Sequence, residues 1–283
     1  MINKPVAVWV YNDEGASELS IQSVLTTIKE KLSADIIAMQ TISSQEILAN
    51  KLNKTIDSES TSIGVFIMPG GADLPYCKKL NGQGNDNIRQ FISEGNVYIG
   101  ICAGGYYGAS AIQFSGQSYE NGCEKDSKKG YEINGARELA FFSGTAIGSI
   151  ATLTDGHLYD ETVSSKAMAT LNYANGQQDE VYYHGGAYFS ADCDANFNVV
   201  ATYIDGKNAV VSGDFGHGKY LLSGVHFELC PDIYERYAVE EASKGDIERE
   251  RSLLVAINHK DYGKLVYREI AEMIEGVGFS KPT

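Results

Sequence analysis

Apolar residues in the first third of the chain follow two alternating spacings. Short, almost continuously apolar runs predict buried strands at 5–11, 34–39, 62–69 and 96–101. Between them, apolar residues three or four positions apart predict helices at 18–32, 44–53, 85–94 and 103–114. This alternation is typical of a mostly parallel sheet that is covered by helices on both faces.

The pattern changes after residue 114. From 115 to about 225 the chain is rich in Gly, Tyr, Thr and Val, and its short apolar runs predict antiparallel strands that extend the sheet. One more strand is predicted at 219–228, and helical spacing returns after Pro231 at 232–243, 246–258 and 261–275. No repeat, linker or low-complexity tract divides the chain. We therefore expect one α/β domain over 1–283, a three-layer α/β/α sandwich with a flavodoxin-like sheet, a β-rich extension at 115–225 and C-terminal helices at 231–283.

Charge and composition exclude several classes of function. The 283 residues include 23 Lys and Arg against 37 Asp and Glu, a formal net charge of −14. This acidic balance argues against a nucleic-acid partner and against docking on anionic membranes. No apolar run approaches the roughly 20 residues that span a bilayer, and the first residues lack the pattern of a signal peptide. Five cysteines without a C-x-x-C pair favour a reducing, cytoplasmic location.

Motifs for metals and cofactors do not occur in the sequence. There is no H-E-x-x-H, C-x-x-C or G-x-G-x-x-G, so we expect neither a metal site nor a cofactor. The run at 213–219 has the spacing G-x-x-x-x-G-K, but Tyr220 follows where a phosphate loop needs Ser or Thr. A hairpin turn is the better interpretation of that run.

Cys102 is the strongest candidate for a chemical role. It follows the predicted strand 96–101 directly and lies within Gly100-Ile101-Cys102-Ala103-Gly104. A nucleophile elbow has this layout, because small neighbours allow the tight turn from strand to helix. A helix N-terminus at this position would favour the reactive thiolate. The alternative is a small buried apolar residue, which is a common role for free cysteine.

His226 and Glu228 supply candidates for the other two members of a triad. Residues two apart in a strand point to the same face, so imidazole and carboxylate would lie side by side in 219–228. The carboxylate would orient the imidazole, and the imidazole would exchange a proton with the Cys102 thiol. A structural histidine beside a surface glutamate is the alternative.

Pro69-Gly70-Gly71 ends the third predicted strand. In a sheet of order 2-1-3-4-5 the loops after the first, third and fourth strands converge, which brings this loop to Cys102. Backbone N–H groups of Gly71 and Ala103 could then form an oxyanion hole, with Gly70 beside them. A plain turn would use the same residues.

These motifs, in this order, resemble the class I glutamine amidotransferase-like superfamily. The segments MPGGADLPY (68–76), GICAGGYYGA (100–109), RELAFFSG (137–144), YHGGAYF (183–189) and SGVHFE (223–228) are most similar to the amino-terminal domain of biotin–protein ligases. The chain lacks the Gly-Arg-Gly-Arg run of the ligase domain, so we expect the amidotransferase-like domain alone and no biotin ligase activity from it.

The resemblance also implies roles at further positions. Glutamine-hydrolysing members of the superfamily carry Gln four residues after the nucleophile, where this chain has Tyr106 followed by Tyr107. Glu14 or Glu18 corresponds to an acid that lies beside the nucleophile in intracellular-protease-like members, although a solvated acid at a helix start is an alternative. His184 could line the cleft, with an ordinary turn histidine as its alternative.

Two functions remain open from the sequence. The first is a cysteine-dependent hydrolase or amidase that acts on a small amide or ester, with Cys102, His226 and Glu228 as its triad. The second is a binding or regulatory module that has kept the fold and lost turnover, which the replacement at Tyr106 favours. The sequence indicates no particular protein partner.

Overall fold

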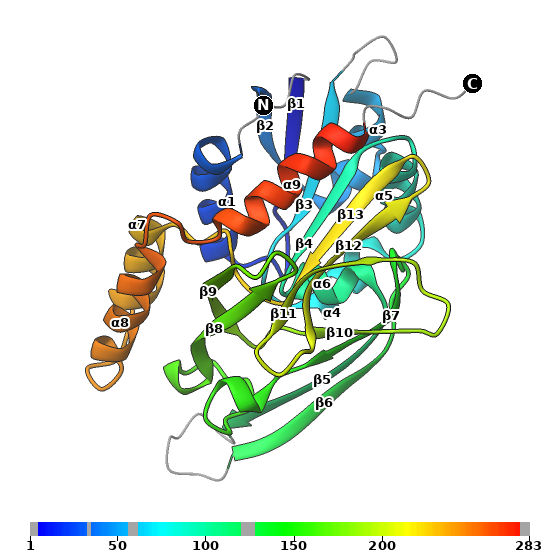
Figure 1. Cartoon of the computed structure of the whole chain (residues 1–283). Helices are drawn as coiled ribbons and strands as arrows, with labels where there is room; N and C mark the ends of the chain where they lie inside the picture. Colours follow the sequence, from blue (N-terminus) through cyan, green and yellow to red (C-terminus); the bar gives the residue numbers. More distant parts are fainter. Residues whose placement is uncertain (1–4, 33–34, 56–61, 120–127, 278–283) are drawn as a thin grey trace.

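The computed structural model describes residues 5–32, 35–55, 62–119 and 128–277. A nine-stranded sheet of order β2-β1-β3-β4-β13-β12-β11-β8-β9 forms its centre (Figure 1). Five neighbouring strands of this sheet are parallel: β2 (Asp35–Ile42), β1 (Pro5–Tyr11), β3 (Ile63–Met68), β4 (Val97–Ile101) and β13 (Gly218–Ser223). The flavodoxin-like order expected from the sequence is confirmed, and β13 takes its fifth place.

The β-rich extension is divided between two sheets. One part continues the central sheet with antiparallel neighbours: β12 (Asn208–Phe215), β11 (Asn198–Tyr203), β8 (Lys166–Tyr173) and β9 (Gln178–His184). The other part forms a separate sheet from β10 (Tyr188–Ala191), β7 (Phe142–Gly148), β5 (Ala109–Tyr119) and β6 (Lys128–Ala136). The prediction that all these strands extend one sheet is wrong, because an alternating pattern indicates a buried face and not the neighbour that covers it. The glycine-rich run at 213–219 joins β12 to β13 as a hairpin, as expected.

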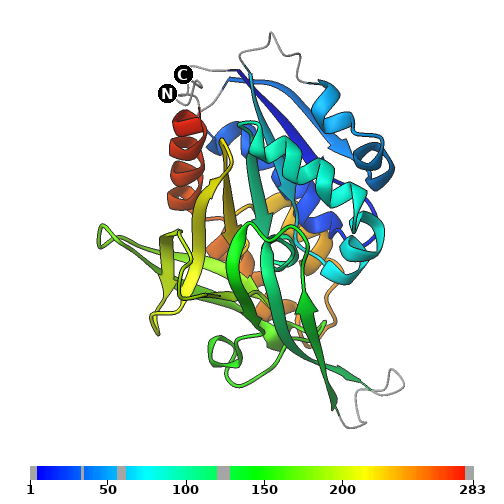
Figure 2. The same ribbon diagram turned by 90° about the vertical axis from the view of Figure 1, so that its right-hand side faces the viewer.

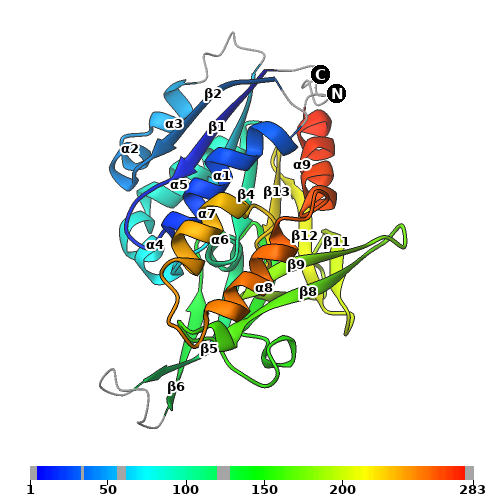
Figure 3. The same ribbon diagram turned by 90° about the vertical axis from the view of Figure 1, so that its left-hand side faces the viewer.

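Each face of the central sheet has its own hydrophobic core, because successive strand residues point to opposite sides. On one face Val8 of β1 belongs to a core with α1 (Glu18–Lys31) and α9 (Lys264–Val277). On the other face Trp9 belongs to a core with α2 (Ser44–Leu48), α4 (Asp73–Leu80) and α5 (Gln83–Ser93). Figures 2 and 3 show these two faces, and helices α1, α7 (Pro231–Tyr234), α8 (Ile247–Ile257) and α9 lie in front in Figure 3. The three-layer arrangement is therefore confirmed.

Several helices differ from their predicted limits. The helix expected at 44–53 is split into α2 and α3 (Lys51–Thr55), with Asn50 between them at a φ of 60°. The helix expected at 103–114 is the short α6 (Ala103–Gly108), because β5 begins at Ala109. Helix α4 has few apolar positions and was not predicted. The helix expected at 232–243 is α7 continued by a π-helical turn, Glu235–Val239.

Within the described ranges no helix combines the length and apolar composition that a bilayer crossing requires. The same ranges contain no group of three or more His, Cys, Asp or Glu side chains suited to a metal ion. Cys77, Cys102, Cys193 and Cys230 are free thiols. Cys123 lies outside the described residues.

Candidate active site

Cys102 lies at the turn from β4 into α6, where the sequence places a nucleophile elbow. Its φ of 49° and ψ of −104° fall in a region that L-residues rarely adopt. The N–H of Cys102 donates to the carbonyl of Ser223 over 2.8 Å, which ties the turn to the end of β13. Glycine is required on both sides: a Cβ on Gly100 would lie 2.3 Å from the carbonyl oxygen of Gly104, and a Cβ on Gly104 would lie 2.1 Å from that of Met68.

His226 and Glu228 lie side by side in the turn after β13. The Nδ1 atom of His226 is 2.9 Å from Oε1 of Glu228, so the two side chains are hydrogen-bonded. The prediction placed both on a strand, but β13 ends at Ser223. Beyond it the N–H of His226 donates to the Tyr182 carbonyl as an isolated bridge. Glu228 is fully buried and His226 is 9% exposed. The turn after β13 therefore brings the two side chains together, and not the alternation of side chains along a strand that the sequence suggested.

Ser20 of α1 connects the acid to the loop after β3, and sequence reasoning missed it. Its hydroxyl donates to Oε1 of Glu228 over 2.7 Å and accepts from the N–H of Gly70 over 3.0 Å. Within the part of the chain that the structure describes, the other carboxylate oxygen of Glu228 is buried without a hydrogen-bond partner. Ser20 therefore fixes the position of the carboxylate through the one oxygen that also holds His226.

The charges around His226 favour its protonated form. Burial alone lowers the pKa of this imidazole, but the Glu228 carboxylate and the Cys102 side chain outweigh burial and raise the pKa to about 10. The imidazole and the Cys102 thiol line the same cavity, so the positive charge of His226 lies at the site of the proposed reaction.

Two backbone N–H groups beside Cys102 have no protein acceptor among the described residues: those of Gly71 and Ala103. Both residues line the same cavity as the thiol. The N–H of Gly70 is different, because it donates to Ser20 and is not free to bind an oxyanion. Gly70 instead leaves room for the imidazole, since a Cβ at this position would lie 2.6 Å from Cε1 of His226.

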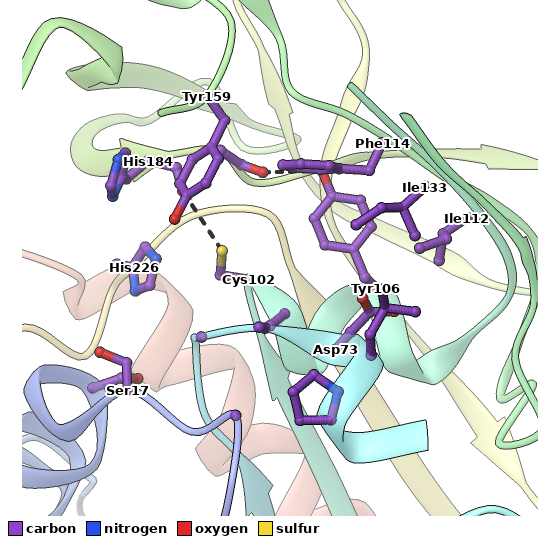
Figure 4. A pocket seen from close by; sticks show the side chains of 18 of the residues that line it. Ser17, Asp73, Cys102, Tyr106, Ile112, Phe114, Ile133, Tyr159, His184 and His226 are labelled. Atoms are coloured by element: carbon purple, nitrogen blue, oxygen red, sulfur yellow. Dashed lines mark hydrogen bonds between the residues drawn. The ribbon is translucent and has the colours of Figure 1, made fainter. Parts of the chain in front are cut away.

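The thiol and the imidazole open onto a cavity of about 550 Å³. In Figure 4, Ile112, Phe114 and Ile133 form an apolar wall to the right of Cys102, Ser17 lies to its lower left, and Asp73 lies below the wall beside Tyr106. The apolar wall comes from β5 and β6 of the smaller sheet, so the β-rich extension completes a site that the central sheet begins. A cavity of this size suits a small molecule.

Three tyrosines near Cys102 have different surroundings. Tyr106 lines the cavity, and its hydroxyl donates to the carbonyl of Gly185 over 3.0 Å. Tyr107 is fully buried on the other side of α6, where its hydroxyl lies 2.6 Å from Oδ1 of Asn85. Tyr76 is also buried and donates to the carbonyl of Pro69. Tyr107 therefore does not line the cavity, because its position on the short helix turns it into the core.

The acids suggested beside the nucleophile lie elsewhere. Glu14 is at the surface, where its carboxylate is 3.3 Å from Nζ of Lys79. Glu18 accepts a hydrogen bond from Gln22 one helical turn along α1. Neither lines the cavity, so the prediction of an acid next to the thiol is wrong for both, and the solvated acid at a helix start is the correct interpretation.

His184 lines the cavity as predicted, but its imidazole is already bonded. Its Nε2 atom is 2.9 Å from the carbonyl oxygen of Asp160 and 3.1 Å from Oγ of Ser165. Burial lowers the pKa of this imidazole to about 3, so it is neutral. The Sγ atom of Cys102 is 3.7 Å from the backbone carbonyl oxygen of His184, so His184 contacts the thiol through its backbone.

Asp73 and Arg137 form a buried ion pair beside the cavity that the sequence did not reveal. The Nε atom of Arg137 lies 2.6 Å from Oδ2 of Asp73. The two residues belong to the segments 68–76 and 137–144, which both carry the resemblance described above. Their pairing joins the first residue of α4 to the segment that follows β6.

Comparison with known proteins places the sequence in a family. The family model described as "Biotin-protein ligase, N terminal" matches residues 6–267. A biotin–protein ligase of Schizosaccharomyces pombe is 28% identical over 239 residues, which cover 80% of this chain and 34% of the ligase. The chain thus spans about a third of the length of that relative. An uncharacterized protein of Chlamydia muridarum is 25% identical over 230 residues, or 80% of this chain and 82% of that protein.

Among solved structures, a glutamine amidotransferase is 18% identical with a TM-score of 0.39, over 68% of this chain and 91% of its own. A ThuA-like protein from Bacteroides uniformis is 11% identical with a TM-score of 0.41, over 93% of this chain and 97% of its own.

Proposed function

The chain belongs to the biotin–protein ligase N-terminal family, and from this premise we propose that it is a cysteine-dependent hydrolase of a small amide or ester. The observation that carries the proposal is the placement of Cys102. It lies at a strained turn, its side chain raises the pKa of the His226 imidazole, and it lines a cavity that His226 also lines. Strain that persists at a cavity is a recurrent property of catalytic positions.

In the proposed reaction the Cys102 thiolate attacks the substrate carbonyl carbon. The N–H groups of Gly71 and Ala103 bind the oxygen that becomes negative. The His226 imidazolium gives its proton to the departing amine or alcohol as the carbonyl bond to that group breaks, which leaves a thioester on Cys102. A water molecule then attacks the thioester, His226 accepts its proton, and the acid and the thiolate are released. Glu228 stabilises the imidazolium and keeps it oriented.

The alternative is a binding or regulatory module without turnover. It is favoured by Tyr106, which stands where glutamine-hydrolysing relatives of the superfamily carry Gln. The two functions differ in whether Cys102 becomes acylated.

Acylation of Cys102 by activated esters tests the proposed function directly. We expect p-nitrophenyl acetate or hexanoate to leave an acyl group on the Cys102 peptide after an acid quench, because the imidazolium and the free N–H groups stabilise the thioester-forming transition state. Intact mass and peptide mapping measure the adduct. Cys193, which is exposed, is the internal control for unassisted reaction of a thiol. Equal labelling of Cys193 and Cys102, or none of Cys102, would support the binding module.

Glutamine should not be a substrate. The Tyr106 phenol occupies the cavity wall and already donates to the Gly185 carbonyl, and a phenol lacks the paired donor and acceptor of a carboxamide. A site without a needed polar contact can reject a substrate by several orders of magnitude. The measurement is ammonia release from glutamine, with ester hydrolysis by the same sample as the positive control. Release that is robust in the wild type and lost in Cys102→Ala would overturn this prediction.

A further inference from the structure

We infer that the cavity selects substrates that carry a positively charged group, bound by Tyr131, Tyr159 and Glu161 away from the reacting carbonyl. This inference rests on the proposed function, since it assigns a class of substrate to the same site. The substrate would be an amide or ester with an apolar segment that ends in an ammonium group.

The three residues form an aromatic and acidic corner of the cavity. All three line it, and the Tyr159 hydroxyl donates to Oε1 of Glu161 over 2.8 Å. Phe114 lies between the two tyrosines, with ring centroids 5.6 Å from Tyr159 and 6.1 Å from Tyr131. Figure 4 shows Tyr159 and Phe114 on the side of Cys102 away from Asp73. Aromatic faces beside a carboxylate attract ammonium groups.

The other charges near the cavity are compensated. Asp73 is paired with Arg137, and His226 is paired with Glu228. His184, whose ring centroid is 4.8 Å from that of Tyr159, is neutral because burial lowers its pKa to about 3. Glu161 has only the Tyr159 hydroxyl as a partner among the described residues.

Among the residues that the structure describes, no lysine or arginine lines the cavity. The net charge of −14 adds a field of the same sign, which raises the local concentration of cations and lowers that of anions. The apolar side chains of Ile112, Phe114 and Ile133 line the same cavity, and they suit a hydrocarbon segment and not a second polar group.

A matched pair of esters tests the inference. The p-nitrophenyl esters of 6-(trimethylammonio)hexanoate and 7,7-dimethyloctanoate have the same shape and differ in one positive charge. We expect the ratio of their kcat/KM values, cation over neutral, to fall about tenfold in Glu161→Gln, because the amide keeps the shape and removes the charge. Glu132→Gln is the matched control, since Glu132 is exposed on β6 and does not line the cavity. A ratio that is the same in all three proteins would overturn the inference.

A binding measurement separates this inference from the proposed function. In Cys102→Ala, an NMR titration compares 6-(trimethylammonio)hexanamide with its uncharged isostere, with and without Glu161→Gln. Tighter binding of the cation that depends on Glu161, together with absence of ester turnover by the wild type, would refute the proposed hydrolysis and uphold the charged subsite. Turnover of esters without any dependence on Glu161 would uphold the proposed hydrolysis and refute the charged subsite.

Discussion

Replacing Cys102 by alanine should lower ester turnover by at least about 10³-fold, because it removes the atom that attacks the carbonyl. The remaining rate would come from the N–H groups and the cavity alone. The change removes only a sulfur atom from a side chain that is 7% exposed, and the helix continues from Ala103. The fold should therefore persist, which circular dichroism and urea unfolding would show beside the kinetic measurement.

Cys193→Ala is the control for this variant. Cys193 is exposed and lies outside the cavity, so its replacement should leave turnover within about twofold of the wild type, as is usual for surface substitutions. Turnover in Cys102→Ala above a tenth of the wild-type value would show that another group performs the reaction and would contradict the proposed nucleophile.

Replacing Glu228 by glutamine should lower the stability of the protein and also slow the reaction. The change keeps an oxygen that can accept from Ser20 and His226, but it removes the charge that holds the imidazolium. Loss of one member of a buried charged pair costs about 3–5 kcal/mol when the other charge stays unpaired. Because the imidazole can lose its proton instead, we expect a loss of about 2–3 kcal/mol in the free energy of unfolding near pH 6. Turnover should fall about 10²-fold or more.

The destabilisation should depend on pH in a definite direction. The pKa of His226 is raised to about 10 in the folded protein, above the ordinary value of about 6.5. The stabilisation from this group is therefore complete below about pH 6.5 and is lost progressively as the pH rises to about 10. Urea unfolding at pH 6, 7.5, 9 and 10 should show the wild type and Glu228→Gln converging at the alkaline end.

Glu14→Gln provides the matched control for that series. Glu14 also belongs to an ion pair, but the pair with Lys79 is at the surface, where such pairs contribute about 0–1 kcal/mol. If Glu228→Gln were no more destabilising than Glu14→Gln at pH 6, the charged interaction of His226 with Glu228 would not exist in solution.

Much of the fold could be predicted because the parallel strands are apolar on both faces. Runs such as 62–69 and 96–101 have no competing interpretation at that length, and the helices between them fix the order of the sheet. The short helix α6 and the unpredicted α4 are different. Their surroundings come from the smaller sheet and from the Asp73–Arg137 pair, which are contacts between distant parts of the chain that local spacing does not encode.

The residues proposed to react could be predicted from the sequence, but the residues that hold them in position could not all be predicted. Cys102, His226 and the Gly70–Gly71 loop belong to motifs in which glycine is needed because a Cβ would collide with neighbouring atoms. The structure brings these residues together around one cavity. Ser20 was missed although the sequence contains a signal for it. Ser20, Ser23 and Thr27 repeat at helical spacing on the buried face of α1, and polar residues at such positions need partners. For Glu14 and Glu18 the sequence left two interpretations open, since nearness to a strand end does not decide which side chains turn inward.

The hydrogen bond between Ser20 and Glu228 joins residues that are 208 positions apart in the chain. A ribosome adds about 5–20 residues per second, so Cys102 is synthesised several seconds before His226 and Glu228. The proposed site is complete only when the segment around His226 docks against α1. A nascent chain that has not reached that segment has the elbow but not the hydrogen-bonded pair of His226 and Glu228.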